Sequence, residues 1–409
     1  GQRVFKGGLL LLLVLIMAWR ALVNGLANYY VDQETPEATA GALRWRSDHP
    51  AALYRSGVAM SEYDPAAAES LLQDAANANP ADALTYLALA EIWQRAGFQD
   101  RAVEMVKIAD VLGPLRTPAL ARSAAFWLQA NRPDLALERW SMLLRTRPAM
   151  ATQLFPVFLQ LAENPATQAL LQPLLAQPPE WWDRFFVYAT THALRLETVA
   201  YLYHHRHRQG ALPSVAEQQA YLGWLWKERR WLQAYLVWLG GLDAQQQGAL
   251  GHIYNGNFEL PMTHFGFDWR WSSPRGVTVE AIETYGTRGG KALHISFNGE
   301  RLRFRHVQQY LYLEPGDYQF QGRGRPDSLK AERGLRWTLH CVSRDTRRLA
   351  ESEAFVGSEE WRNFTVAFIV PATDCPLQLL QLELEGRAEL EFKAEGDAWF
   401  DDLLISRLR

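Results

Sequence analysis

The sequence predicts a multidomain α and β protein: an N-terminal membrane helix, an all-α solenoid and a C-terminal antiparallel β-sandwich. Three observations predict it. An apolar stretch lies before residue 31, a proline-marked repeat follows, and alternating hydrophobic residues replace helical spacing after about residue 250. The 409 residues suffice for two or three domains. We place the predicted boundaries at 1–30, 31–248 and 249–409.

Composition narrows the classes of partner. The chain is 48% hydrophobic and 21% charged, with a net charge of −3, so no global field favours nucleic acid and we expect no nucleic-acid partner. The two cysteines, Cys341 and Cys375, are too few for a four-thiolate zinc site. They are a disulfide candidate if the compartment is oxidising.

The N-terminal stretch has the layout of a signal peptide or signal anchor. Arg3 and Lys6 precede a leucine-rich run, Gly7–Trp19, and apolar residues resume over Ala21–Tyr30. Together they reach the roughly 20 residues of a membrane helix, with Arg20 able to extend to one interface. No clear small-x-small cleavage site follows, so we favour an uncleaved anchor over a cleaved signal.

The charges at the N-terminus predict the orientation. Basic residues before the span favour a cytoplasmic N-terminus. We therefore expect a single-pass protein of the inner (cytoplasmic) membrane, with the bulk of the chain in the periplasm or another extracytoplasmic space.

A repeat follows the anchor. Pro80, Pro114 and Pro148 are spaced 34 residues apart. The same register aligns Ala68, Ala102 and Ala136, then Leu72, Val106 and Trp140, then Ala75, Ala109 and Leu143. Small residues let paired helices approach, and a proline after the second helix ends it. The pattern resembles the tetratricopeptide repeat, which implies a solenoid that binds a peptide or protein partner on its concave face. A plain spacer is the alternative.

Past Pro148 the period fades while helical spacing persists. We predict helices over Ala151–Ala162, Trp181–Leu194, Glu217–Leu225 and Arg230–Leu239. The last two segments are predicted to form one more helix pair, in which the repeat pattern is degenerate.

The C-terminal part has strand signals. Leu302 and Phe304 alternate with three arginines, and two further runs, 335–341 and 380–385, alternate in the same way. Turn signals separate the runs. A region of about 160 residues with many short strands predicts a β-sandwich.

Four short motifs carry a second resemblance. They are Asn255–Glu259, Leu313–Tyr318, Trp361–Phe364 and Gly396–Leu403. In that order they resemble carbohydrate-binding modules of the galactose-binding-like, jelly-roll fold, over about residues 252–409. The resemblance specifies the fold better than the ligand, because this fold also has purely structural roles.

The resemblance implies candidate glycan contacts. The aromatic candidates are Phe267, Trp269, Trp271, Tyr310, Tyr312, Trp337 and Trp399. We single out Phe267, Trp269 and Trp271, whose segment mixes aromatic and charged residues, although most sandwich aromatics are core.

A row of arginines is a second candidate surface. Arg301, Arg303 and Arg305 are expected on one face of one strand, with Arg323 and Arg325 following nearby. Such a row could meet an acidic polysaccharide or a lipid head group. A solvated sheet face is the alternative.

The resemblance also implies a structural calcium ion. Glu259 and Asp402 match positions near which such modules often hold one. A hydrogen-bonded pair of terminal strands without metal is the alternative. No other cofactor is implied.

No catalytic motif is present. The sequence has no phosphate-binding glycine-rich loop, no His-Glu-x-x-His and no Gly-x-Ser-x-Gly. We therefore expect a non-enzymatic scaffold. The combination of anchor, repeats and glycan-type module resembles accessory proteins of exopolysaccharide synthesis or export. The alternative is a structural subunit of a larger membrane complex whose sandwich binds protein rather than sugar.

Overall fold

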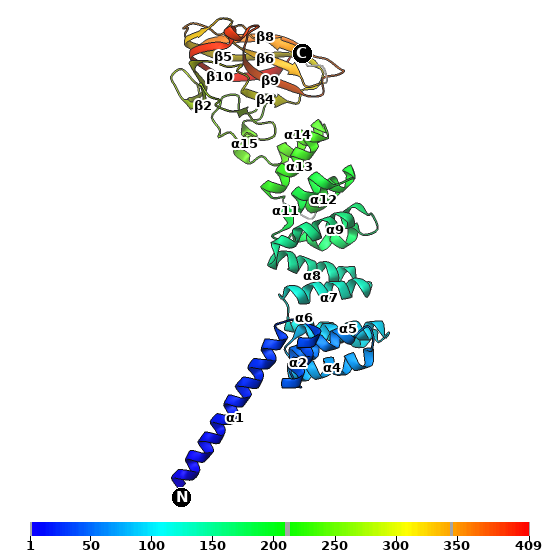
Figure 1. Ribbon diagram of the computed structural model, residues 1–409. Helices are drawn as coiled ribbons and strands as arrows, with labels where there is room; N and C mark the ends of the chain where they lie inside the picture. The colour runs from blue at the N-terminus through cyan, green and yellow to red at the C-terminus, as the bar shows by residue number, and fades with distance from the viewer. Residues whose placement is uncertain (1, 209–212, 344–346, 409) are drawn as a thin grey trace. The chain divides into compact units, whose positions relative to one another are not determined.

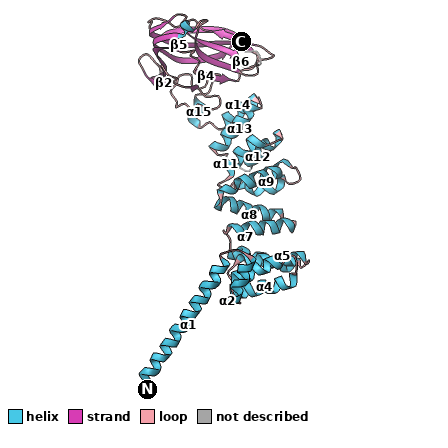
Figure 2. Ribbon diagram, in the orientation of Figure 1, coloured by secondary structure: helices cyan, strands magenta, loops and turns pink. Residues whose placement is uncertain are grey.

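The computed structural model describes residues 2–208, 213–343 and 347–408 (Figure 1). Internal contacts divide the chain into two compact units, Gly1–Ala211 and Leu212–Arg409. The first is helical, and the second combines helices with two β-sheets (Figure 2). The fold class is the one that the sequence predicts.

Helix α1 (Gln2–Val31) carries the apolar stretch. Within the described residues, Leu12–Val31 is long and apolar enough to cross a membrane, a test that a signal sequence also passes. Most of its large side chains between Leu12 and Leu22 are exposed to the surroundings.

The last turns of α1 belong to the helical body. Ala27 is buried. The Asn28 Oδ1 atom lies 2.8 Å from His49 Nε2, and the Arg46 guanidinium donates to Asn24 Oδ1 at 3.1 Å. The end of α1 therefore packs against the helices that follow it.

Helix pairs follow at the spacing of the prolines. After α2 (Pro36–Trp45), the helices are α3 (Pro50–Met60), α4 (Pro65–Ala78), α5 (Ala83–Arg95), α6 (Gln99–Leu112), α7 (Thr117–Gln129) and α8 (Pro133–Thr146). The second helices of three pairs begin at Pro65, Gln99 and Pro133, which reproduces the repeat of the sequence. Ala90 and Ala102 are fully buried, as close helix packing requires.

The remaining helices of this unit pack around large rings. They are η1 (Pro148–Met150), α9 (Ala151–Glu163), η2 (Gln168–Leu171), α10 (Gln172–Ala176), α11 (Trp182–His192) and α12 (Leu196–Arg208). The Phe158 ring lies 5.0 Å from Trp181 and 5.9 Å from Phe185. Rings replace the alanines of the earlier pairs, and the sequence period is lost with them.

The last helical pair belongs to the sandwich unit. This unit begins with α13 (Val215–Lys227), α14 (Trp231–Gly240) and α15 (Ala244–Gly248). The Trp226 ring lies 5.0 Å from Tyr310 and 5.2 Å from Phe267, and Tyr235 stacks on Tyr312 at 5.5 Å. These contacts join α13 and α14 to the sandwich within the second compact unit.

The strands form two antiparallel five-stranded sheets. Sheet 1 has the order β1-β4-β9-β6-β7 and sheet 2 has the order β2-β3-β10-β5-β8. The strands are β1 (Arg270–Trp271), β2 (Val277–Glu283), β3 (Lys291–Arg301), β4 (Val307–Leu311), β5 (Gly316–Ala331), β6 (Leu335–Cys341), β7 (Arg347–Glu351), β8 (Arg362–Val370), β9 (Gln378–Leu384) and β10 (Lys393–Arg407), with η3 (Glu389–Phe392) before the last.

Aromatic rings fill the space between the sheets. Trp337 of sheet 1 lies 5.4 Å from Phe400 and 6.3 Å from Phe320, both of sheet 2. Trp269 approaches the same indole at 5.7 Å. All four side chains are buried, so alternation along each strand directs the intervening residues outward.

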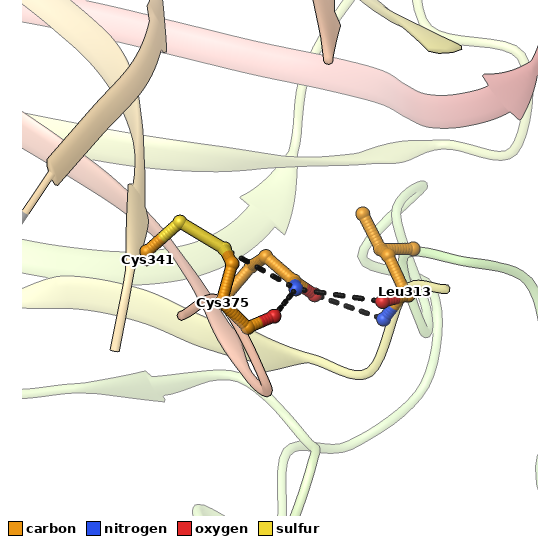
Figure 3. The surroundings of a disulfide bond; sticks show 4 residues. Leu313, Cys341 and Cys375 are labelled. Carbon is orange, nitrogen blue, oxygen red and sulfur yellow. Dashed lines mark hydrogen bonds between the residues drawn. A yellow bond between two sulfur atoms is a disulfide. The ribbon is translucent and has the colours of Figure 1, made fainter. Parts of the chain in front are cut away.

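Cys341 and Cys375 form a disulfide bond between the end of β6 and the loop before β9 (Figure 3). The Gln378 side chain fixes this loop: its Nε2 donates to Cys375 O at 2.9 Å, and its Oε1 accepts from Leu313 N at 2.8 Å. The bond closes a sequence separation of 34 residues. Chain entropy gives such a loop about 3–4 kcal/mol of stabilisation against the unfolded state.

Replacing Phe267 with alanine tests the packing of α13 and α14 on the sandwich. We expect Phe267→Ala to lower the free energy of unfolding of this unit by about 3–5 kcal/mol, because the ring fills a buried site between helices and strands. Urea denaturation of the full chain in detergent, followed by tryptophan fluorescence, measures it. Ile369→Ala, at a position 64% exposed on β8, is the control with an expected change within about 0.5 kcal/mol. Equal effects of the two variants would contradict the packing.

Candidate functional site

Register places one row of polar and aromatic side chains across the outer face of sheet 2. Glu280 of β2 pairs with His294 of β3, His294 with Trp399 of β10, and Trp399 with Arg325 of β5. Their neighbours along the strands, Leu293 and Phe400 among them, point into the core. Directly opposed side chains on one face lie close enough to interact.

The arginine of this row is surrounded by rings. The Arg325 Cζ atom lies 4.1 Å from the ring centroid of Tyr285, 5.0 Å from Trp399 and 5.5 Å from Trp361. His294 stacks on Trp399 at 4.0 Å. Cation–π attraction therefore holds rings from β10 and from two loops on one cation.

Arg325 has few polar partners for a buried charge. It is 5% exposed, its Nη2 donates to Thr284 Oγ1 at 3.2 Å, and its buried Nε has no hydrogen-bond partner. Among the described residues no carboxylate forms an ion pair with it. The three rings offset its desolvation.

A pocket of about 520 Å³ adjoins this cluster. Its lining on sheet 2 comprises Gln321, Arg323, Asn363, Thr365, Asp402 and Leu404, and the segment 248–257 and Arg288 complete it. Arg323 joins the two features, because its Cζ lies 5.1 Å from the Trp361 ring while the side chain lines the pocket. We call the rings and this pocket together the sheet 2 face.

A β-bulge separates the two adjacent aspartates at the edge of the pocket. The β10–β5 pairing shifts between Asp401 and Leu404, and Asp402 has a φ of 53°. Asp401 is consequently buried, whereas Asp402 lines the pocket.

The expected metal pair has other partners. Glu259 Oε1 accepts from Lys291 N at 2.9 Å. Asp402 Oδ2 lies 3.4 Å from Arg323 Nη1 and 3.4 Å from Arg288 Nε. The guanidinium groups would oppose a cation at Asp402 by like-charge repulsion.

Asp401, which the sequence did not single out, has the free carboxylate oxygen. Its Oδ1 accepts from Asp402 N at 2.7 Å, while its buried Oδ2 has no partner. The pKa of Asp401 is raised to about 6: burial and the nearby charges of Asp402 and Glu259 raise it, and they outweigh the hydrogen bond from Asp402 N and the charge of Arg323, which lower it. Within the described residues, no three His, Cys, Asp or Glu side chains form a metal-binding group, so a cation here would need backbone carbonyls as well.

Of the aromatic candidates from the sequence, Trp399 lies in this cluster, whereas the three singled out, Phe267, Trp269 and Trp271, lie elsewhere. Trp269 has no exposed surface, and its Nε1 donates to Asn255 O at 3.1 Å. Phe267 is covered by Trp226 and Tyr235. The faces of Phe267 and Trp269 are thus used in packing, whereas Trp271 is half-buried on the edge strand β1.

The arginine row lies on a connection rather than on one strand. Strand β3 ends at Arg301, and residues 302–306 cross to β4 in the other sheet. The three arginines are exposed and alternate with buried Phe304 as expected. Arg303 lies over Phe392 at 4.8 Å, and Arg305 Nε lies 2.9 Å from a Glu383 oxygen.

Glu383, on the outer face of sheet 1, is a carboxylate with hydrogen-bond and ion-pair partners. Burial raises its pKa, but hydrogen bonds from His340 and Thr338 and the charge of Arg305 outweigh burial and hold the pKa at about 2. The group therefore stays ionised and paired, which suits a structural role.

Tyr285 was not among the candidates from the sequence, and Trp361 was named there only as part of a fold motif. Tyr285 lies in the β2–β3 loop and Trp361 directly before β8. The Trp361 Nε1 donates to Tyr285 O at 2.9 Å. Trp399, one of the aromatic candidates from the sequence, lies between two core positions of a strand, which indicates an outward-facing ring.

No protein-family model and no curated protein matches this chain. Among solved structures, a CBM4 module is 17% identical and covers 38% of this chain and 99% of its own, with a TM-score of 0.29. The module TmCBM61, solved in complex with β-1,4-galactotriose, is 18% identical over 39% of this chain and 99% of its own, with a TM-score of 0.27. MamA is 20% identical over 34% of this chain and 89% of its own, with a TM-score of 0.25.

The buried carboxyl of Asp401 predicts a pH dependence of stability. Its folded pKa, about 6, lies above the value near 3.9 of an unfolded chain. Protonation thus favours the folded state, and stability falls as pH rises from about 4 to 6. Relative to Asp401→Asn, the wild type should lose up to about 3 kcal/mol over this window in chelator-containing buffer.

Urea denaturation of both proteins across this range measures the difference. Asparagine keeps the Oδ1 acceptor for Asp402 N and stays neutral. The contributions of the other titrating groups are therefore the same in both proteins and cancel in the difference between their stabilities. Parallel stability curves would refute the assignment.

Proposed function

We propose that this chain is a membrane-anchored extracytoplasmic binding and scaffolding protein, an accessory factor of exopolysaccharide synthesis or export. Its sandwich holds a glycan on the sheet 2 face, and its helical repeats hold a protein partner. The observation that carries the glycan assignment is the cluster of Tyr285, Trp361 and Trp399 around Arg325, beside a polar pocket.

The chemistry of this face suits a saccharide. Sugar rings have an apolar face that stacks on aromatic side chains, and Tyr285 is 64% exposed. Sugar hydroxyls both donate and accept, and the amides of Gln321 and Asn363 and the Thr365 hydroxyl line the adjoining pocket. Aromatic walls with a few convergent polar groups are typical of ligand sites.

Other parts of the chain support the remaining assignments. The apolar helix α1 would supply the anchor. Helix pairs at the period of the tetratricopeptide-like repeat would offer a peptide-binding surface. The Cys341–Cys375 disulfide fits an oxidising compartment.

A structural calcium ion is part of the proposal, with a changed donor set. The unpartnered Asp401 Oδ2 and the nearby Glu259 carboxylate are hard oxygen donors of opposite charge to the ion. Backbone carbonyls would complete the set. The ion would neutralise the buried Asp401 charge and hold the last strand to the segment that opens the sandwich.

Calcium binding is tested by thermal denaturation of the full chain. We expect millimolar calcium to raise the melting temperature of the wild type by several degrees over chelator, because a ligand of the folded state stabilises it. Asp401→Asn should lose this shift, and Asp402→Asn should keep it. The same shift with magnesium, or none in the wild type, would count against a calcium site.

Glycan binding is tested on the full chain in detergent with an array of neutral and acidic glycans. Calorimetry on the positive glycans follows. We expect Trp361→Ala and Tyr285→Ala to weaken binding about tenfold or more, because each removes a stacking surface. Ile369→Ala, at an exposed position of the same sheet, should bind as the wild type does.

Two results would redirect the assignment. Loss of binding in Trp271→Ala alone would move the site to the edge strand β1. A folded chain that binds no glycan would refute the sugar assignment and favour the structural subunit whose sandwich binds protein.

A further inference from the structure

The sheet 2 face has more guanidinium groups than carboxylates to pair with them. Arg288 and Arg323 line the pocket with Asp402, and Arg325 lies next to them under the rings. Asp402 is the one carboxylate in the lining of this pocket; Asp401 is only 1% exposed, and the Glu259 side chain lies against Gly289, outside the lining. The charged side chains of the pocket lining therefore have one positive charge in excess.

The pairing with Asp402 is loose. Its Oδ2 lies 3.4 Å from a nitrogen of each pocket arginine, longer than the 2.7–2.9 Å of a strong charge-assisted hydrogen bond. The Arg288 side chain is 83% exposed. A better-placed carboxylate could therefore take over these donors.

The two arginines are held in different ways. Arg323 Nη2 donates to Gly286 O at 2.7 Å, and its guanidinium lies over Trp361, so its planar fork is fixed in place. Arg288 belongs to the same β2–β3 loop as Gly286 and Tyr285, which closes on itself through a Thr284 N to Gly290 O hydrogen bond of 3.0 Å. The fixed guanidinium of Arg323 and the exposed side chain of Arg288 thus flank the pocket beside the stacking rings.

We propose that the saccharide bound on the sheet 2 face is acidic, with a uronic-acid-type carboxylate seated between the guanidinium groups of Arg288 and Arg323. This inference rests on the proposed glycan-binding function. The planar guanidinium matches a carboxylate with two parallel hydrogen bonds. The pocket amides and the Thr365 hydroxyl would bind the ring hydroxyls of the same sugar unit.

The exposed arginines on the β3–β4 connection are the rival basic surface. Arg305 is paired with Glu383, and Arg303 lies over Phe392. None of the three arginines lines the pocket of the sheet 2 face. Arg301, at the end of β3 where this connection begins, serves as a matched control for a general charge effect.

The experiment compares oligosaccharides that differ only in the carboxylate. Oligomers of galacturonan, mannuronan and glucuronan are each measured beside their carboxyl-reduced neutral forms, by calorimetry on the full chain in detergent. We expect at least one charged oligomer to bind about tenfold or more tightly than its reduced form. Arg288→Gln and Arg323→Gln should each weaken binding of the charged oligomer about tenfold or more. The affinity of Arg323→Lys should lie between those of the wild type and Arg323→Gln, since lysine keeps the charge but lacks the planar guanidinium. Arg301→Gln should bind as the wild type does.

The outcomes separate this inference from the function it rests on. If reduced and charged forms bind equally, or only neutral glycans bind, the proposed glycan binding is supported and the inference that the saccharide is acidic is contradicted. If Arg301→Gln loses binding while the pocket variants keep it, the acidic site is on the β3–β4 connection and the inference is overturned. If no glycan of either kind binds the folded chain, the proposed function fails first. Arg288→Gln changes an exposed side chain, so it keeps the test valid should Arg323→Gln fail to fold.

Discussion

The sandwich depends on the packing of one buried indole, Trp337, against rings from the opposite sheet. Phe320 of β5 and Phe400 of β10 contact it, and these two residues fix which face of each strand points inward. A shift of one residue would exchange the faces of a strand. The outward positions of Arg325 and Trp399 follow from this core, and so does the aromatic cluster that we assign to ligand binding.

The sequence predicted the parts that rest on periodicity. The proline spacing located three helix pairs, and alternation identified strands such as Leu335–Cys341. The sequence did not show which aromatic side chains are exposed. The pattern of residues around a ring in a strand is the same whether helices or solvent cover that ring. Phe267 is covered by Trp226 from a helix 41 residues away in sequence. Tyr285 joins its partners only through register and loop closure, which a single sequence does not encode locally.

Neighbouring aspartates illustrate the same limit. The motif at the C-terminal strand indicated a metal near Asp402, and only the bulge reveals that the chain turns Asp401 inward and Asp402 outward. One residue therefore has the unpartnered oxygen of a buried site, while the next contacts the arginines of an open pocket. Two adjacent carboxylates serve different surfaces because backbone conformation, not residue type, sets their direction.

The hydrogen bonds of Asn24 and Asn28 have a consequence for how the helical unit is oriented. They connect the end of α1 to Arg46 and His49 without an intervening flexible linker. A chain anchored through α1 would transmit the tilt of that helix in the bilayer directly to the first repeats. Bilayer thickness, which influences the tilt of a spanning helix, would thereby affect the angle at which the repeats face the membrane surface.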